Sequence, residues 1–269
     1  MTPKSILPWY LKLPAKIALS RLPISRATWQ RLDLFRAGGM DCDHYAREVF
    51  CGHLRACGLR SLHGLTVLEL GPGNGLLTAK YATELGASHV WLIDSECLLS
   101  ANNTESTVRT TYLTNGLQSL RQIRHRSIDF VFSNAVLEHV RLHELQPTIT
   151  ELSRIIKVTG VASHQIDFRD HLQNALNNLR FSERIWESEF MASSGFYTNR
   201  VDWSAMREMF QKSGFVITRE SLTHWESLPT QQSKMASPFN SFPPERLATM
   251  GAFVVMRPAA SRLAVPNVE

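Results

Sequence analysis

Two short segments of this chain bring together acidic and histidine side chains that could move protons. Glu138 and His139 are adjacent, and a second group places His164, Asp167 and His171 within one short stretch. A histidine with a pKa near 6.5 is mostly neutral at pH 7, so it can take a proton from a hydroxyl group. If a helix begins at Asp167, this acid shares a face with His171 and can orient its imidazole. The candidate catalytic residues are therefore His139, His171, Asp167 and His164.

Each of these residues also has an explanation that involves no catalysis. His139 could cap or pack beneath a sheet, and His164 could be a core histidine with satisfied hydrogen bonds. Asp170 could cap a following helix. The acids and histidines of the second group are all metal-ligand types, but their spacing matches no metal motif. We expect no metal site.

A strand, a glycine turn and a helix precede these residues in the chain. Residues 66–70 are a short apolar run that contains one acid, Glu69, and a helical pattern begins after residue 75. Glycines between them allow positive φ and let a ligand approach the main chain, while the helix N-terminus offers free N–H groups. A second apolar run, residues 89–93, ends in Asp94, about 20 residues beyond the turn, where an acid usually binds ribose hydroxyls. The pattern predicts an adenosine-containing cofactor at the carboxyl edge of a parallel sheet.

Two further apolar runs fit the same sheet. Residues 127–133 read as a buried parallel strand, and they lead into the segment Asn134-Ala135-Val136-Leu137-Glu138-His139-Val140. Residues 147–157 place apolar side chains on one helical face, and Gly160 is a plausible end for that helix. Residues 161–166 then read as a fifth strand.

These motifs, in this order, resemble the class I S-adenosylmethionine (SAM) methyltransferases. The glycines are spaced G-x-G-x-G with Glu69 two residues before the first, Asp94 follows the second strand, and the -LEHV segment is similar to the small-molecule branch of the family. The resemblance covers roughly residues 62–258. It implies an α/β, Rossmann-like, doubly wound seven-stranded sheet of order 3-2-1-4-5-7-6 whose last strand is antiparallel. It also implies SAM as cofactor and S-adenosylhomocysteine as product.

The resemblance implies roles for individual residues. The glycine loop curls under the aminoacyl end of the cofactor, Asp94 takes both ribose hydroxyls, and Asn115 could hold the adenine amino group. The implied cofactor-binding residues are Glu69, Gly71, Pro72, Gly73, Asn74, Gly75, Asp94, Ser95, Asn115, Asn134 and Ala135. The implied lid and substrate residues are Met40, Tyr45, Glu138, Tyr197, Asn199 and Arg200.

The chain divides into an N-terminal helical arm and lid (residues 1–61), a SAM-binding domain (residues 62–258) and a C-terminal tail (residues 259–269). Residues 168–200 form a helical insert after strand five, rich in aromatic side chains that could line the substrate pocket or form the insert's own core. The last two strands, near residues 215–222 and 251–257, have no helix between them, which indicates an antiparallel pair.

The net charge of +5 is concentrated in the arm, where residues 1–36 contain seven Lys and Arg against Asp33 alone. Such an arm could meet anionic lipid or a lipid-linked substrate as a peripheral membrane contact. The reading we favour is an amphipathic helix that packs on the domain with its lysines pointing outward. We expect no nucleic-acid partner, because the arm carries no base-reading motif.

The four cysteines form no C-x-x-C pair, no run of about 20 apolar residues spans a bilayer, and the N-terminus is no convincing signal peptide. A cytoplasmic location follows as an expectation. We predict a SAM-dependent methyltransferase of biosynthesis that methylates a small molecule, most simply a hydroxyl of a sugar, glycan or secondary metabolite. The alternatives are a SAM-binding scaffold without activity and another SAM-using group transferase. The segment after strand four lacks the prolines of amino-group methylases, which argues against base methylation.

Overall fold

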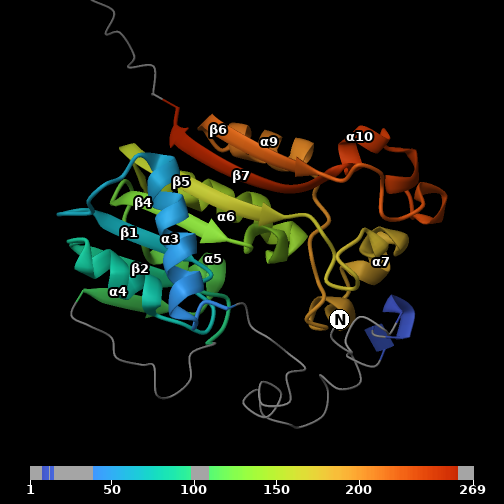
Figure 1. The fold of residues 1–269 in the computed structure, drawn as a ribbon, viewed down its shortest axis with the longest axis horizontal. Coiled ribbons are helices and arrows are strands. Elements are labelled where there is room, and N and C mark those ends of the chain that lie inside the picture. The colour runs from blue at the N-terminus through green and yellow to red at the C-terminus, as the bar shows by residue number, and fades with distance from the viewer. Residues whose placement is uncertain (1–7, 12, 15–38, 98–108, 260–269) are drawn as a thin grey trace, which may run out of the picture.

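The computed structural model describes residues 8–11, 13–14, 39–97 and 109–259. Seven strands form one sheet of order β3-β2-β1-β4-β5-β7-β6, with helices on both faces (Figure 1). Neighbouring strands from β3 to β5 are parallel, whereas β7 runs antiparallel to both β5 and β6. The predicted fold class, strand order and antiparallel last strand are confirmed. Most of the predicted arm, residues 98–108 and residues 260–269 lie outside the described residues.

The elements alternate along the chain as in a doubly wound fold. The strands are β1 Thr66–Leu70, β2 His89–Ile93, β3 Thr110–Leu113, β4 Ile128–Asn134, β5 Ile156–Asp167, β6 Phe215–His224 and β7 Thr249–Pro258. The α-helices are α3 Asp43–Cys57, α4 Leu77–Glu84, α5 Gly116–Gln122, α6 Leu142–Ile155, α7 Glu183–Trp186, α8 Glu189–Ala192, α9 Trp203–Lys212 and α10 Pro244–Leu247. The 3₁₀ turns are η3 Leu137–His139, η4 Asn177–Arg180, η5 Gln232–Lys234 and η6 Phe239–Ser241.

Strand β4 shows how the sheet builds a core on each face. Phe130 and Phe132 are buried in a cluster with residues of α3 and α4, while Val131 is buried in a second cluster with residues of α6 and α9. Successive side chains of a strand point to opposite faces, so a strand covered on both sides must be apolar throughout. Because β1 to β5 are parallel, their carboxyl ends lie at the same edge of the sheet, and the loops that follow these strands meet there.

The helix before β5 differs from the prediction for residues 147–157. It begins at Leu142, contains Pro147, and buries one apolar face made of Leu145, Ile149, Leu152 and Ile155. That burial outweighs the backbone hydrogen bond that Pro147 cannot donate. Strand β5 follows without a loop, so Gly160 lies inside the strand and does not end the helix. The strand needs glycine there because a Cβ would lie only 3.0 Å from the carbonyl oxygen of Asp129.

The insert packs mainly on itself and on the arm. Trp186, Met191, Phe196 and Tyr197 form a small buried cluster with Leu172 and Leu13. The Trp9 ring meets Phe181 edge to face with centroids 6.0 Å apart, and the arm segment lies beside α7 (Figure 1). Most of the insert's aromatic surface is thus its own core, and the described part of the arm packs on it. None of the helices within the described ranges is long and apolar enough to cross a membrane.

Candidate functional site

The glycine turn leaves the carboxyl end of β1 and passes directly under the ends of β2 and β4. Gly71 has φ +72° and donates its N–H to the Ile93 carbonyl at 2.7 Å. Gly73 has φ +68°, and a Cβ added there would meet nothing within 4 Å. The Asn74 side-chain oxygen is buried and has no hydrogen-bond partner among the described residues. The turn therefore presents open space, bare main chain and an unused acceptor at one place.

A segment before α3 closes over this turn. A Cβ on Gly75 would collide with the Met40 carbonyl, so only glycine allows the glycine turn and the segment before α3 to cross this closely. Met40 itself is buried, and the Asn134 amide donates to the Tyr45 hydroxyl at 3.4 Å. Tyr45 is 41% exposed, whereas Phe50 of the same helix is buried, so the two side chains lie on different faces of α3. Both lid candidates thus lie where residues of α3 and its approach meet the glycine turn and the end of β4.

Two carboxyl groups stand behind the turn. Asp94 ends β2, accepts from the backbone N–H of Ser95 at 2.8 Å and from that of Gly73 at 3.3 Å, and is 8% exposed. Burial raises the pKa of Asp94, and these backbone donors act in the opposite direction. Glu69 is 2% exposed, accepts a hydrogen bond from Thr78, and has a pKa raised to about 8 by burial. A positively charged ligand would favour the ionised form of both acids.

The loops after β3 and β4 complete this edge. Asn115 precedes α5, its backbone N–H donates to Ser119 at 3.0 Å, and the adjacent Gly116 lies against Ser95. Ala135 takes φ +53°, which is uncommon for a residue with a side chain, and its N–H donates to the Gln165 carbonyl at 2.9 Å. Asn115, Ser95, Asn134 and Ala135 therefore all lie at the carboxyl edge, as the cofactor assignment requires.

Two histidines face each other beyond β4. The His139 Nε2 and His171 Nε2 atoms are 3.0 Å apart, and the His139 Nδ1 atom lies 2.9 Å from the Tyr197 carbonyl. A carbonyl only accepts, so Nδ1 of His139 carries the proton and its Nε2 accepts from His171. Loss of water around the ring lowers the pKa of His139, while the Tyr197 carbonyl and the Asp167 carboxylate act in the opposite direction. His139 is thus a base whose neutral form is favoured and whose tautomer is fixed, with Nε2 as its acceptor atom.

Asp167 and His164 stand differently toward this pair. The chain turns after β5 instead of starting a helix, and the Asp167 carboxylate binds the Arg169 guanidinium at 2.8 Å. The predicted helix that would place Asp167 and His171 on one face is therefore wrong, although the Asp167 carboxylate still acts on His139 through its charge. His164 is fully buried, lies 2.7 Å from the Ser133 hydroxyl and stacks on Phe210. It is a core histidine, and burial lowers its pKa to about 3.

Asp170 organises the start of the insert. Its carboxylate is fully buried and accepts from the backbone N–H groups of Leu172, Gln173, Ala175 and Asn177. The expected helix cap is therefore wrong: the carboxylate closes an irregular turn, and no helix follows it directly. The turn holds His171 opposite His139.

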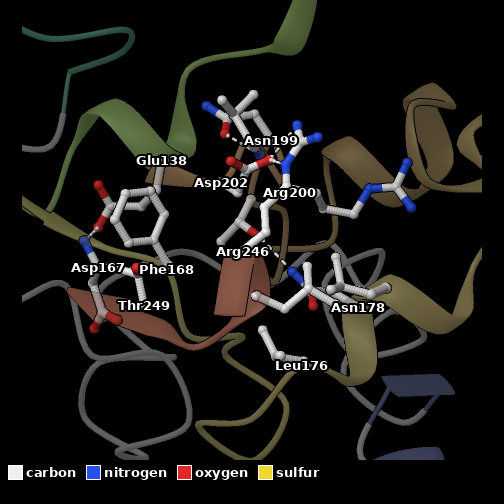
Figure 2. Close-up of a pocket in the computed structure, with 14 residues that line it drawn as sticks. Glu138, Asp167, Phe168, Leu176, Asn178, Asn199, Arg200, Asp202, Arg246 and Thr249 are labelled. Atoms are coloured by element: carbon white, nitrogen blue, oxygen red, sulfur yellow. Dashed lines mark hydrogen bonds and ion pairs between the residues drawn. The ribbon is translucent and has the colours of Figure 1, made fainter. Parts of the chain in front are cut away.

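A cavity opens on the far side of β5, between the sheet and the insert (Figure 2). It encloses about 410 Å³ of empty space, including its mouth. Of the predicted substrate residues, Glu138, Asn199 and Arg200 line it, whereas Tyr197 does not. The Tyr197 ring is buried in the insert, where its hydroxyl donates to Glu187 at 2.8 Å and accepts from the Leu142 N–H at 3.0 Å.

Sequence reasoning missed several walls of this cavity. Asn178 and Thr198 hydrogen-bond across it at 2.9 Å, and Asp202 pairs with Arg246 at 2.8 Å. Asp202 carried one signal, because it is the N-cap of α9. Arg246 comes from the proline-rich connection before β7 and belongs to no motif. Within the described residues, no group of three or more acids, histidines or cysteines is arranged to hold a metal ion.

Comparison with known proteins agrees with this geometry. Residues 68–163 match the sequence model of a family described as a methyltransferase domain. No curated protein matches the chain. Among solved structures, a chain from the Haloferax volcanii complex of the Trm112 methyltransferase activator with a candidate methyltransferase has a TM-score of 0.51 and 16% identity, covering 82% of this chain and 94% of its own.

Two other solved structures share the fold. Haemonchus contortus phosphoethanolamine N-methyltransferase 2, bound to phosphomonomethylethanolamine and S-adenosylhomocysteine, has a TM-score of 0.50 and 15% identity over 79% of this chain and 53% of its own. The [4+2]-cyclase SpnF has a TM-score of 0.51 and 11% identity over 79% of this chain and 80% of its own. At such identities the likeness concerns the fold, and one fold carries several activities.

Proposed function

We propose that this chain, whose residues 68–163 form a SAM-dependent methyltransferase domain of class I, transfers a methyl group to a hydroxyl of a small molecule. The His139–His171 pair is the observation that carries the choice of a hydroxyl. A hydroxyl acceptor loses a proton when it is methylated, and a neutral histidine of fixed tautomer can take that proton.

The residues at the glycine turn fit SAM. The Gly73 position leaves open space above bare main chain, the buried Asn74 oxygen lacks a partner among the described residues, and Asp94 offers a carboxylate for ribose hydroxyls. When bound, SAM supplies a methyl group on a positively charged sulfur. Buried Glu69 and Asp94 favour a cation at this edge because a nearby positive charge makes it easier for them to ionise.

The residues beyond β4 deal with the proton. The Tyr197 carbonyl holds the proton of His139 on Nδ1 and leaves its Nε2 free to accept. A hydroxyl that replaces His171 at this nitrogen would give its proton to His139 Nε2 while its oxygen takes the methyl group. His139 would then hold a proton on both ring nitrogens and carry the positive charge. Ordered donors and acceptors at fixed positions supply most of what a displacement of this kind needs from the protein.

The proposal is tested by incubating the purified chain with SAM carrying a deuterated methyl group and an extract of small molecules. Mass spectrometry should find labelled products whose label sits on oxygen. Label on nitrogen or carbon would overturn the hydroxyl assignment. Calorimetric binding of SAM and S-adenosylhomocysteine without transfer to any acceptor would favour the alternative of a SAM-binding scaffold.

A further inference from the structure

The cavity beside β5 has polar atoms in its walls that the described residues leave unsatisfied. Glu138 is 3% exposed; its Oε1 accepts from the Asp167 N–H at 3.2 Å, while its Oε2 has no described partner. Asn178 is 1% exposed; its amide N–H donates to Thr198, while its Oδ1 has no described partner. Burying such atoms unpaired destabilises the folded protein. Two on the walls of one cavity point to a ligand that supplies hydrogen bonds.

A third unsatisfied atom restricts the chemistry further. The Arg200 Nε–H is buried without a described partner, although its Nη1 donates to the Phe181 carbonyl at 2.7 Å. The ligand must therefore accept at Arg200 and donate at Asn178. At Glu138 it must do one or the other, according to the protonation state of that acid. Hydroxyl groups both donate and accept, so a molecule with several of them satisfies all three positions.

The charges of the cavity favour a neutral ligand. Arg169 neutralises Asp167, and Arg246 neutralises Asp202, each at 2.8 Å. Burial raises the pKa of Glu138 to about 8, which favours its neutral form at pH 7. An ammonium group would find no unpaired carboxylate, and a phosphate would find only Arg200, whose pKa burial lowers. Neither an amine nor a phosphorylated compound is matched as well as an uncharged one.

The remaining walls are apolar. Leu176, Leu179, Val201 and Leu247 line the cavity together with the Phe168 ring, which lies between Glu138 and Thr249 in the view of Figure 2. Such walls suit the C–H faces of a ring whose hydroxyls point to the polar atoms.

We propose that this cavity binds an uncharged polyhydroxylated ring of the sugar type through Glu138, Asn178 and Arg200. Glu138, which lines the cavity, directly precedes His139 in the chain, and Asp167, at the end of β5, lines it as well. The bound ring is thus the acceptor of the methyl group, a role that rests on the proposed function. The binding itself does not depend on it. The ring could be a free sugar or the end of a glycan, since both present the same hydroxyls.

The test is NMR of the full chain with labelled leucine and valine methyl groups, recorded with and without S-adenosylhomocysteine. The probes are D-glucose and D-galactose for free sugars, their methyl glycosides for glycan ends, cyclohexanol for a ring with one hydroxyl, and ethanolamine for a cation. We expect saturable shifts of the Leu176, Leu179, Val201 and Leu247 methyls with a sugar or glycoside, and nuclear Overhauser contacts to its ring protons. Stronger binding of cyclohexanol or ethanolamine, or no shift with any sugar, would overturn the proposal.

Variants separate a direct contact from a structural one. Asn178→Leu should weaken sugar binding about tenfold, as expected for one hydrogen bond of about 1.4 kcal/mol. Thr198→Val removes the same internal hydrogen bond but keeps Asn178 Oδ1, and should change the affinity less than twofold. Asn240→Leu, at an exposed asparagine of η6, is the matched control. Equal losses of sugar affinity in Asn178→Leu and Thr198→Val would contradict a direct contact. If Asn178→Leu does not fold, the Overhauser contacts of the wild-type protein provide the test instead.

Calorimetry with S-adenosylhomocysteine on the same samples keeps the two proposals apart. Cofactor binding without sugar binding refutes the sugar assignment alone. Sugar binding without cofactor binding refutes the proposed function and leaves the cavity assignment standing.

Discussion

The cofactor edge and the acceptor cavity lie at the same end of one sheet, yet they are built differently. The cofactor edge depends on residues 69–75 and on Asp94. Backbone N–H groups of the glycine turn hold it: Gly71 donates to the Ile93 carbonyl and Gly73 to the Asp94 carboxylate. The cavity gathers side chains from η3, β5, the insert, the start of α9 and α10. A local motif can therefore hold a common cofactor, while an acceptor site assembled from distant segments can change without disturbing it.

The largest effect should come from the base between the two regions. We expect His139→Ala to lower the methyl-transfer rate by about 100- to 10,000-fold, the usual contribution of a general base. Binding of S-adenosylhomocysteine should stay the same, because His139 makes no contact with the glycine turn. Single-turnover kinetics with labelled SAM measures the rate, and His143→Ala, at an exposed histidine of α6, is the control. A rate loss that appears equally in both variants would refute the assignment of the base.

At the cofactor edge itself, Asp94→Ala should weaken S-adenosylhomocysteine binding by about 100-fold or more. Each charge-assisted hydrogen bond to a ribose hydroxyl contributes about 1.5–3 kcal/mol, and 1.4 kcal/mol is a factor of ten. Calorimetry measures the change, and Glu96→Ala, at an exposed acid two residues away, is the matched control. If Glu96→Ala weakens binding as much as Asp94→Ala, the loss reflects the net negative charge of this edge and not a contact made by Asp94. The cofactor edge would then not depend on this residue.

The two regions also differ in how far the sequence predicts them. The glycine turn was predictable because only glycine adopts its backbone and permits the close crossing at Met40, and these limits are visible in the spacing. The cavity was not, because Asn178 and Arg246 meet only through tertiary packing. The assignment of His164 failed because β5 is covered on both faces, so alternation alone does not show which of its side chains reach a site. The helix expected at Asp167 was wrong because spacing does not show that the chain turns there and that Arg169 binds the acid.

The electrostatics of the cofactor edge should appear as a pH effect of about tenfold. Glu69 has a raised pKa of about 8, so it is mostly neutral at pH 6 and becomes ionised as the pH rises past 8. SAM carries one positive charge more than S-adenosylhomocysteine, so its affinity relative to that product should rise as Glu69 ionises, between about pH 7 and 9, and then level off. Calorimetry of both ligands across this range measures the ratio.

A matched pair of variants assigns this pH effect to one carboxyl group. Glu69→Gln should make the ratio independent of pH, whereas Glu84→Gln, at an exposed acid of α4, should leave it as in the wild type. A constant ratio in the wild-type protein would mean that Glu69 does not sense the sulfonium charge. The cofactor edge would then bind by shape and hydrogen bonds alone.

The smallest expected effect is a difference in stability between two tyrosine variants, one in the insert and one at the cofactor edge. Tyr197→Phe removes a buried hydroxyl that donates to Glu187 and accepts from the Leu142 N–H, so we expect a loss of about 1–2 kcal/mol in the free energy of unfolding. Tyr45→Phe removes a hydroxyl at the cofactor edge. Tyr45 is 41% exposed, and the one hydrogen bond described for its hydroxyl is long, at 3.4 Å. It should cost less than about 0.5 kcal/mol, as surface changes usually do.

Urea denaturation measures the free energy of unfolding of both variants, and the values are comparable if the dependence on urea concentration has the same slope in each. Methyl transfer should survive in Tyr197→Phe, because the backbone carbonyl that fixes His139 is unchanged. Equal stability losses in the two variants would show that the acceptor side depends no more on tertiary hydrogen bonds than the cofactor edge does. A loss confined to Tyr197→Phe would instead show that the stability of the insert depends on buried side-chain hydrogen bonds, in contrast to the glycine turn, which is held through its backbone N–H groups.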